Sequence, residues 1–237
     1  MKAMILAAGR GERMRPLTDT CPKPLLPVGG KPLIVWQIER LAAAGVAEVV
    51  INHAHLGGQV EAALGDGTRF GVRISYSPEK EALETAGGIA QALPLLGSAP
   101  FLVLSADIYC ECDYRALLDE ICLDDHALAW LWMVDNPSWH PAGDFALRDG
   151  RLHLDGGPKL TYANFGVFRP EMFSAIVPGT RLPLRPLFDA AIPAGRIQAT
   201  RLDALWDNLG TPAQLAELDT LLRGRNRCAD MPSSDLP

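Results

Sequence analysis

Near its start the chain reads Met4-Ile5-Leu6-Ala7-Ala8-Gly9-Arg10-Gly11, a short apolar run that leads into two glycines. The apolar run predicts a buried strand, and the glycines predict a turn whose backbone amides can approach a phosphate closely. Charged residues follow at once between positions 10 and 15. The segment therefore does not resemble a signal peptide, and it predicts a strand followed by a phosphate-binding turn.

Strands and helices alternate over the first 110 residues. Apolar residues at helical spacing predict helices at 32–44, 57–64 and 86–95, and apolar runs predict strands at 46–51, 72–76 and 100–105. Short connections between such elements are typical of crossover units in a mostly parallel sheet. Ligands bind outside the carboxyl ends of strands in these sheets. We therefore expect the glycine turn, the stretch after Tyr76 and Asp107 to meet at one edge.

The second half of the chain is less regular. Apolar runs predict strands at 128–134, 162–168 and 197–202, and Asp149-Gly150 between alternating residues predicts a hairpin over 145–154. A closing helix is expected at 212–222, followed by a disordered tail at 223–237.

Composition and charge exclude several classes of protein. The formal net charge is −6 and the pI about 5.4, which argues against a general nucleic-acid binder. No apolar run is long enough to span a bilayer, so we expect a cytoplasmic protein. Its five cysteines should stay reduced. Cys110, Cys112 and Cys122 do not have zinc-site spacing and are expected to be ordinary thiols, and His53 and His55 lack a third metal ligand.

Two standard phosphate-binding motifs can be tested against the glycine turn. A P-loop needs Gly-Lys-Ser/Thr after the second glycine, and the dinucleotide fingerprint needs a third glycine where this chain has Met14. Both readings fail. What remains is a turn that leads to Arg13, which can fork onto phosphate oxygens, and to Lys23, which Pro22 and Pro24 hold in place. The alternative is a solvated loop whose cations bind nothing.

The motif Gly9-x-Gly11-x-Arg13-Met14-x-Pro16-Leu17-Thr18, followed by Pro22-Lys23-Pro24-Leu25, resembles the signature of sugar-1-phosphate nucleotidyltransferases. Glu84-Thr85-Ala86-Gly87-Gly88 and the strand-end Asp107 fit the same family in order and spacing. The resemblance implies a single Rossmann-like three-layer α/β domain over 1–222, with a mixed, mostly parallel sheet. Its nucleotide-binding half would be 1–110 and its sugar-binding half 111–222.

The resemblance also implies roles for particular residues. Arg13, Lys23 and Asp107 would be catalytic. The nucleotide would be bound by Leu6, Ala8, Gly9, Gly11, Glu12, Arg13, Lys23, Glu79, Thr85, Gly87 and Ser105, and the sugar by Gly143, Asp144 and Asn164. The alternative for these last three is a purely structural role as hairpin and turn residues.

The expected metal is Mg²⁺. Asp107 follows a buried strand, where a carboxylate is a natural magnesium ligand, although a turn-forming aspartate is the alternative. Members of the family usually show a second aspartate before the Gly-Thr that opens the last helix. This chain reads Asp207-Asn208-Leu209-Gly210-Thr211, so Asn208 holds the ligand position and Asp207 lies one residue early.

The activity implied is transfer of UMP from UTP to an amino-sugar 1-phosphate, with N-acetylmuramic acid 1-phosphate of cell-wall recycling as the favoured acceptor. Alternatives within the class are mannose-1-phosphate with GTP and glucose-1-phosphate with UTP or dTTP. A different class, a non-catalytic nucleotide-sugar-binding regulatory module, is favoured by Asn208. We expect a monomer with no nucleic-acid or membrane partner.

Overall fold

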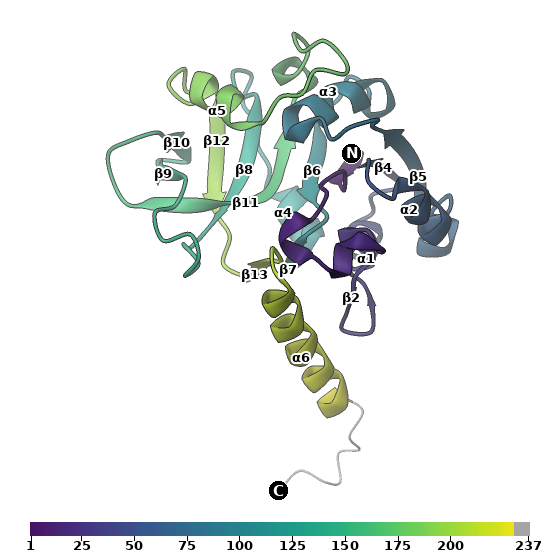
Figure 1. The fold of residues 1–237 in the computed structure, drawn as a ribbon. Helices are drawn as coiled ribbons and strands as arrows, with labels where there is room; N and C mark the ends of the chain where they lie inside the picture. Colours follow the sequence, from purple (N-terminus) through teal and green to yellow (C-terminus); the bar gives the residue numbers. More distant parts are fainter. Residues whose placement is uncertain (230–237) are drawn as a thin grey trace, which may run out of the picture.

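The computed structural model describes residues 1–229 of the chain (Figure 1). Its α-helices are α1 (Leu33–Ala43), α2 (Gly57–Leu64), α3 (Glu84–Leu96), α4 (Tyr114–Asp119), α5 (Arg185–Ala191) and α6 (Pro212–Ala229). Short 3₁₀ turns are η1 (Glu12–Met14), η2 (Leu17–Asp19), η3 (Lys23–Leu25), η4 (Thr68–Phe70) and η5 (Pro170–Met172). Within these residues, no helix combines the length and the apolar character that crossing a membrane requires.

The strands are β1 (Ala3–Leu6), β2 (Pro27–Val28), β3 (Lys31–Pro32), β4 (Glu48–His53), β5 (Arg73–Pro78), β6 (Phe101–Ser105), β7 (Ile108–Glu111), β8 (Ala129–Val134), β9 (Phe145–Arg148), β10 (Arg151–His153), β11 (Lys159–Phe168), β12 (Ile197–Arg201) and β13 (Leu205–Asn208). Most of them form one sheet in the order β5-β4-β1-β6-β11-β8-β12-β10-β9. The strands from β5 to β6 pair in parallel, as the crossover pattern predicted. From β11 onward the pairings are antiparallel except for β8 with β12. The predicted α/β fold with a mixed sheet is confirmed.

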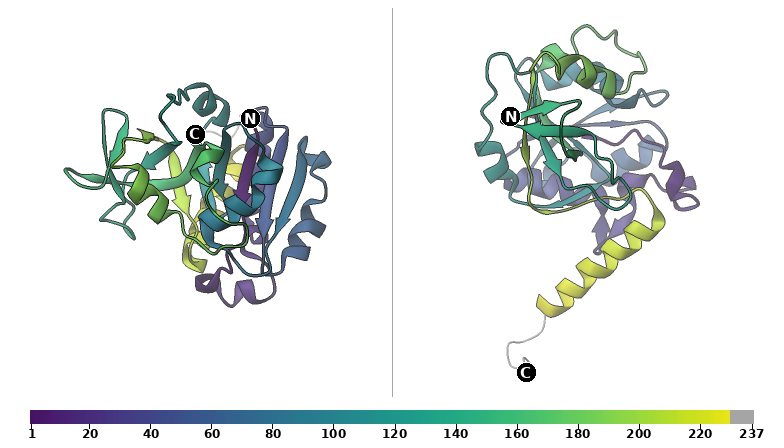
Figure 2. Two further views of the ribbon diagram at one scale, coloured as in Figure 1. Left: turned by 90° about the horizontal axis from the view of Figure 1, so that it is seen from above. Right: turned by 90° about the vertical axis from the view of Figure 1, so that its left-hand side faces the viewer.

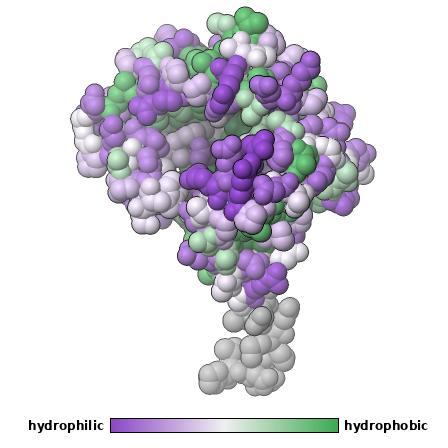
Figure 3. Space-filling view, in the orientation of Figure 1, coloured by the Kyte–Doolittle hydropathy of each residue, from purple (hydrophilic) through white to green (hydrophobic). Residues whose placement is uncertain are grey.

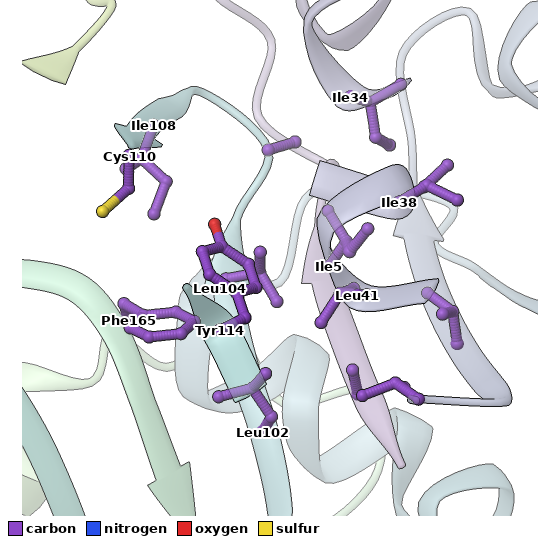
Figure 4. Packing of buried hydrophobic residues seen from close by; sticks show 14 of the residues in the cluster. Ile5, Ile34, Ile38, Leu41, Leu102, Leu104, Ile108, Cys110, Tyr114 and Phe165 are labelled. Carbon is purple, nitrogen blue, oxygen red and sulfur yellow. The ribbon is translucent and has the colours of Figure 1, made fainter. Parts of the chain in front are cut away.

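Helices cover both faces of this sheet, which gives three layers (Figures 1 and 2). On one face Ile5 of β1 packs with Ile34 and Ile38 of α1 (Figure 4). On the other face Met4 belongs to the cluster that includes Ile89 of α3. Both β1 side chains are fully buried, and each such burial contributes about 1.5–3 kcal/mol. Burial on two faces fixes β1, and with it the turn that follows.

Helix α6 ties the end of the described chain to the amino-terminal loops. Its buried leucines pack with Met14 and Val28, and they are Leu215, Leu218 and Leu222. Asp219 adds a polar link, because its Oδ1 accepts a hydrogen bond of 2.8 Å from the Gly29 amide. The prediction of a disordered tail from residue 223 is wrong for 223–229, which continue this helix. A single Gly224 costs a helix only about 1 kcal/mol. Residues 230–237 lie outside the described part of the chain.

The hairpin predicted around Asp149-Gly150 is present as β9 and β10. Asp149 has φ +50° and Gly150 has φ +72°, which is the left-handed pair of a tight hairpin turn. The short strands β7 and β13 were not predicted. They pair with each other although about a hundred residues separate them, with Asn208 opposite Ile108. That pairing brings β13 to the segment beside Asp107.

Candidate active site

The glycine turn follows β1 directly and is fixed by contacts with Thr18. Gly11 adopts φ +66°, and a side chain there would bring a Cβ within 2.9 Å of Thr18 Cγ2. The buried Thr18 hydroxyl donates a 2.8 Å hydrogen bond to the Gly11 carbonyl. Gly9 differs, because a Cβ built there meets nothing within 4 Å. Gly11 is therefore required by the fold, whereas the space beside Gly9 is open to a ligand.

A cavity of about 560 Å³ opens at this turn, at the edge of the sheet where the parallel strands β1, β4 and β6 end. The same face of the molecule is hollowed in the space-filling view, with strongly hydrophilic residues beside the hollow (Figure 3). Of the residues predicted to bind nucleotide, it is lined by Leu6, Ala8, Gly9, Gly11, Glu12, Arg13, Lys23, Thr85 and Ser105. Asp107 also lines it, so the turn, Lys23 and Asp107 meet as expected.

Two neighbouring arginines lie in different places. Arg13 lines the cavity and rests on Gly210, where a Cβ would come within 3.0 Å of its Nη2. No carboxylate of the described residues forms a salt bridge with Arg13, so its charge is available to an anion. Arg15 instead pairs with Asp19 at 3.2 Å and is absent from the cavity lining.

Lys23 and Asp107 form an ion pair inside the cavity. Lys23 Nζ lies 2.6 Å from Asp107 Oδ2, and the lysine side chain is only 11% exposed. Lys23 sits at the start of η3, after Pro22, whose ring restricts the backbone. The other oxygen, Asp107 Oδ1, is buried and has no hydrogen-bond partner among the described residues. Lys23 therefore orients the carboxylate while leaving one oxygen free.

Asn208 supplies a second free oxygen, on the strand β13 that pairs with the segment after Asp107. The Leu209 amide donates a 2.9 Å hydrogen bond to the Asp107 carbonyl, which fixes β13 against this segment. Asn208 Oδ1 is buried and, like Asp107 Oδ1, lacks a partner in the described part of the chain. Buried polar groups are normally satisfied. Carboxylate and amide oxygens are ligands that Mg²⁺ accepts, so these two atoms fit a magnesium site.

Asp207 does not share that position. Successive side chains of a strand point to opposite faces, so Asp207 and Asn208 diverge. Asn208 lines the second cavity, described below, whereas Asp207 lines neither of the two. Burial raises the pKa of Asp207 above its ordinary value, with a smaller contribution from the nearby charge of Glu217. The described residues contain no group of three or more His, Cys, Asp or Glu side chains that could hold a metal. A magnesium ion would therefore depend on ligands from a bound nucleotide as well.

A second cavity of about 310 Å³ adjoins the first, and the two share Leu6, Thr85 and Ser105. Asp144 and Asn164, two of the residues expected to bind the sugar, line it. Asn164 has φ +54°, at an irregularity between Tyr162 and Gly166 where β11 shifts register against β8. Such bulges re-aim side chains at functional sites.

Gly143 does not line this cavity. Its φ is +62°, and a Cβ there would lie 2.7 Å from Asn136 Oδ1. The glycine serves the turn before β9, so its position is explained by the alternative that it is a turn residue.

Glu79 and Gly87 also lie outside both cavity linings. Glu79 is buried, and its oxygens accept hydrogen bonds from Asn52 Nδ2 at 2.7 Å and the Leu83 amide at 2.8 Å. Burial raises the pKa of this carboxyl above its ordinary value. Gly87 lets α3 approach the chain's own backbone, because a Cβ there would lie 2.2 Å from the Thr180 carbonyl. Glu79 therefore fixes Asn52, and Gly87 allows α3 to pack closely against the backbone at Thr180.

Sequence reasoning did not name Arg10, Asn52 and Arg181 as site residues, although each of them lines the first cavity. Asn52 holds the turn, because its Oδ1 accepts a 2.8 Å hydrogen bond from the Ala7 amide. It is the first polar residue after the apolar run of β4, and the strand-edge argument that found Asp107 applies to it equally. Arg181 pairs with Glu84 at 2.8 Å across a long sequence separation that no local pattern reveals.

Comparison with known proteins places this site in a family. A family model described as nucleotidyl transferase matches residues 2–137. The N-acetylmuramate alpha-1-phosphate uridylyltransferase of Neisseria meningitidis serogroup B is 51% identical over 226 residues, covering 93% of this chain and 98% of that protein. The protein of the same name from Caulobacter vibrioides is 36% identical, covering 90% of this chain and 94% of its own length. Mannose-1-phosphate guanyltransferase beta-A of Xenopus laevis is 31% identical, and the match covers 90% of this chain but 62% of that protein.

Solved structures share the fold. A Bacillus anthracis protein assigned as a glucose-1-phosphate thymidylyltransferase superposes with a TM-score of 0.82 at 23% identity, covering 99% of this chain and 98% of that chain. HddC from Yersinia pseudotuberculosis, complexed with GMP-PN, gives a TM-score of 0.76 at 20% identity, covering 93% of this chain and 98% of that chain.

Proposed function

Because this chain belongs to the nucleotidyl transferase family, we propose that it transfers UMP from UTP to N-acetylmuramate α-1-phosphate and releases pyrophosphate. The chain is a sugar-1-phosphate nucleotidyltransferase. The choice of UTP and of this acceptor is supported by the 51% identity to the meningococcal uridylyltransferase over nearly the full length of both chains. The reaction runs in the cytoplasm, where nucleoside triphosphates are available, and the chain acts as a monomer.

The two adjoining cavities support a donor site and an acceptor site. UTP occupies the larger cavity, with its phosphates against the backbone amides of Ala8 to Gly11. The sugar occupies the smaller one, where Asp144 and Asn164 offer hydrogen-bond partners. The shared wall at Leu6, Thr85 and Ser105 is where the sugar phosphate meets the α-phosphate. Holding both reactants in this way turns a bimolecular step into an effectively unimolecular one.

The chemistry needs positioning and charge neutralisation. An oxygen of the sugar phosphate forms a bond to the α-phosphorus of UTP, and the bond between that phosphorus and the oxygen bridging to the β-phosphate breaks. The attacking oxygen is already ionised, so no general base is required. Arg13 stabilises the charge that develops on the departing pyrophosphate, and Lys23 neutralises the reacting phosphates. Asp107 and Asn208 would hold Mg²⁺, which would supply further charge neutralisation at the phosphates.

Pyrophosphate release tests the proposal. The protein is incubated with Mg²⁺, each of UTP, GTP and dTTP, and the 1-phosphates of N-acetylmuramate, N-acetylglucosamine, mannose and glucose. We expect the fastest release with UTP and N-acetylmuramate 1-phosphate, complete loss on adding EDTA, and recovery with excess Mg²⁺. Faster turnover with GTP and mannose 1-phosphate would assign the chain to the guanylyltransferase branch. No release with any pair would favour a regulatory binding module.

A variant pair checks that the measured activity belongs to this site. Asp107→Asn removes the carboxylate charge from the proposed metal site and should lower turnover by about 10²-fold or more. Arg201→Gln is the control, because this arginine pairs with Asp135 on the exposed surface and lines neither cavity. Light scattering on the purified protein measures whether it is a monomer.

A further inference from the structure

The acceptor cavity is lined by one carboxylate, one imidazole and one guanidinium, and the first two of these groups contact each other. Asp144 Oδ2 accepts a 2.8 Å hydrogen bond from the Tyr162 amide, and Asp144 Oδ1 lies 3.2 Å from His140 Nε2. Both carboxylate oxygens therefore already have a partner. The remaining charged group in the lining is Arg185, at the start of α5. Among the described residues its ion-pair partner is Asp189, which lies outside the cavity lining.

Arg185 is held in place from two sides. Its guanidinium carbon lies 4.9 Å from the centre of the Phe145 ring, which supports the planar group from below. Its Nε donates a 2.7 Å hydrogen bond to Asp189 Oδ1, one turn further along α5. No partner among the described residues takes a hydrogen bond from the two terminal nitrogens. They form a fork of donors fixed at the cavity wall, the arrangement that binds a carboxylate or phosphate with two parallel bonds.

The position of Arg185 selects between these two anions. The reacting phosphates belong at the wall shared with the nucleotide cavity, and Arg185 does not contribute to that wall. It lies instead among Phe145, Leu184 and Phe188 of the acceptor cavity. An uncharged amino sugar has hydroxyls and an acetamido group and needs no cation there. N-acetylmuramate carries in addition a lactyl ether that ends in a carboxylate.

We propose that Arg185 binds the lactyl carboxylate of the acceptor and thereby selects N-acetylmuramate 1-phosphate over N-acetylglucosamine 1-phosphate. This inference rests on the proposed function, because it concerns the acceptor that the proposal assigns. Arg185 is a specificity-determining residue that touches the sugar's side group and takes no part in the transfer step. Asp189 and Phe145 act as positioning residues for its guanidinium.

The test compares Arg185→Gln with wild type on both acceptors at saturating UTP. Glutamine keeps much of the side-chain length and removes the charge and the fork. We expect kcat/KM for N-acetylmuramate 1-phosphate to fall about 10- to 50-fold, chiefly through KM, because a charge-assisted pair of bonds is lost. For N-acetylglucosamine 1-phosphate the change should stay below about threefold. Arg201→Gln should change neither value.

A substrate lacking the charge completes the comparison. The acceptor whose lactyl carboxylate is converted to an amide should bind wild type as weakly as the natural acceptor binds Arg185→Gln, and Arg185→Gln should lose little more with it. Calorimetric dissociation constants give the same comparison where turnover is slow. An equal loss with both acceptors, or no loss with either, would overturn the role of Arg185. Wild-type protein that neither binds nor turns over the muramate substrate would instead overturn the proposed function.

Discussion

Replacing Asn208 by aspartate adds a second carboxylate beside Asp107. In the structure both Asp107 Oδ1 and Asn208 Oδ1 are buried without a hydrogen-bond partner among the described residues. The substitution keeps the shape of the side chain and changes its charge. If these oxygens hold Mg²⁺, Asn208→Asp should tighten metal binding. It should also destabilise the metal-free protein, because two carboxylates that share a site repel each other.

The size of the effect follows from the electrostatics of a partly buried site. Two unit charges about 4 Å apart interact by about 4 kcal/mol at an effective dielectric constant of about 20. The attraction of the new carboxylate to a divalent ion is offset in large part by the desolvation of both charges and by loss of the amide ligand. A net gain of about 1.4 kcal/mol corresponds to about a tenfold lower Mg²⁺ concentration for half-maximal activity. Without metal, a loss of about 1–2 kcal/mol should lower the melting temperature by roughly 2–8 °C.

Two measurements on Asn208→Asp read these effects separately. Pyrophosphate release as a function of Mg²⁺ concentration gives the metal requirement, and thermal melting in EDTA gives the stability of the metal-free protein. Asp207→Asn is the matched control, since its side chain points to the other face of β13. It should leave the Mg²⁺ midpoint unchanged. An unchanged midpoint in Asn208→Asp, or a shift of the midpoint in Asp207→Asn, would refute the assignment of Asn208 as a ligand.

Four further variants test other parts of the structure. Gly9→Ala should change the melting temperature by less than about 2 °C, because a Cβ at this position meets nothing within 4 Å. The same variant should raise KM for UTP about tenfold, because the added methyl group takes space beside the phosphates. Arg13→Ala should lower kcat by about 10²–10³-fold, whereas Arg15→Ala, which breaks an exposed pair with Asp19, should change it less than about threefold. Burial raises the pKa of Glu79 above its ordinary 4.5. Its contribution to the free energy of unfolding is therefore fully present below about pH 4.5, and it is lost as the pH rises through the pKa of Glu79 in the folded protein. Denaturant unfolding should therefore show Glu79→Gln furthest below wild type near pH 4, with a gap that narrows toward pH 7; a gap that widens would contradict this sign.

The first cavity was predictable because its position follows from local signals and one rule of topology. The apolar run of β1 and the glycines after it predicted a strand and a turn. Asp107 was placed beside them because parallel strands end at a common edge. The same rule applies to Asn52, whose side-chain oxygen accepts a hydrogen bond from the turn. It was missed because Asn52 is not part of any recognised motif.

Other features depend on tertiary contacts that sequence periodicity does not carry. The strands β7 and β13 are short and stabilise each other across a separation of about a hundred residues, and strand propensity is governed by such context. Glu79 and Gly87 were expected against the nucleotide. Spacing alone could not reveal that Glu79 is bonded to Asn52 and the Leu83 amide, or that Gly87 faces the Thr180 carbonyl.

A crystal structure of the protein with UTP and Mg²⁺ bound would examine the phosphate turn, Lys23 and Asp107 as one site. We expect the triphosphate to lie against the amides of Ala8 to Gly11 and the guanidinium of Arg13. The metal should be coordinated by Asp107 Oδ1 and Asn208 Oδ1 together with phosphate oxygens. A triphosphate bound away from Arg13 and Lys23, or a metal held by Asp207, would contradict the account.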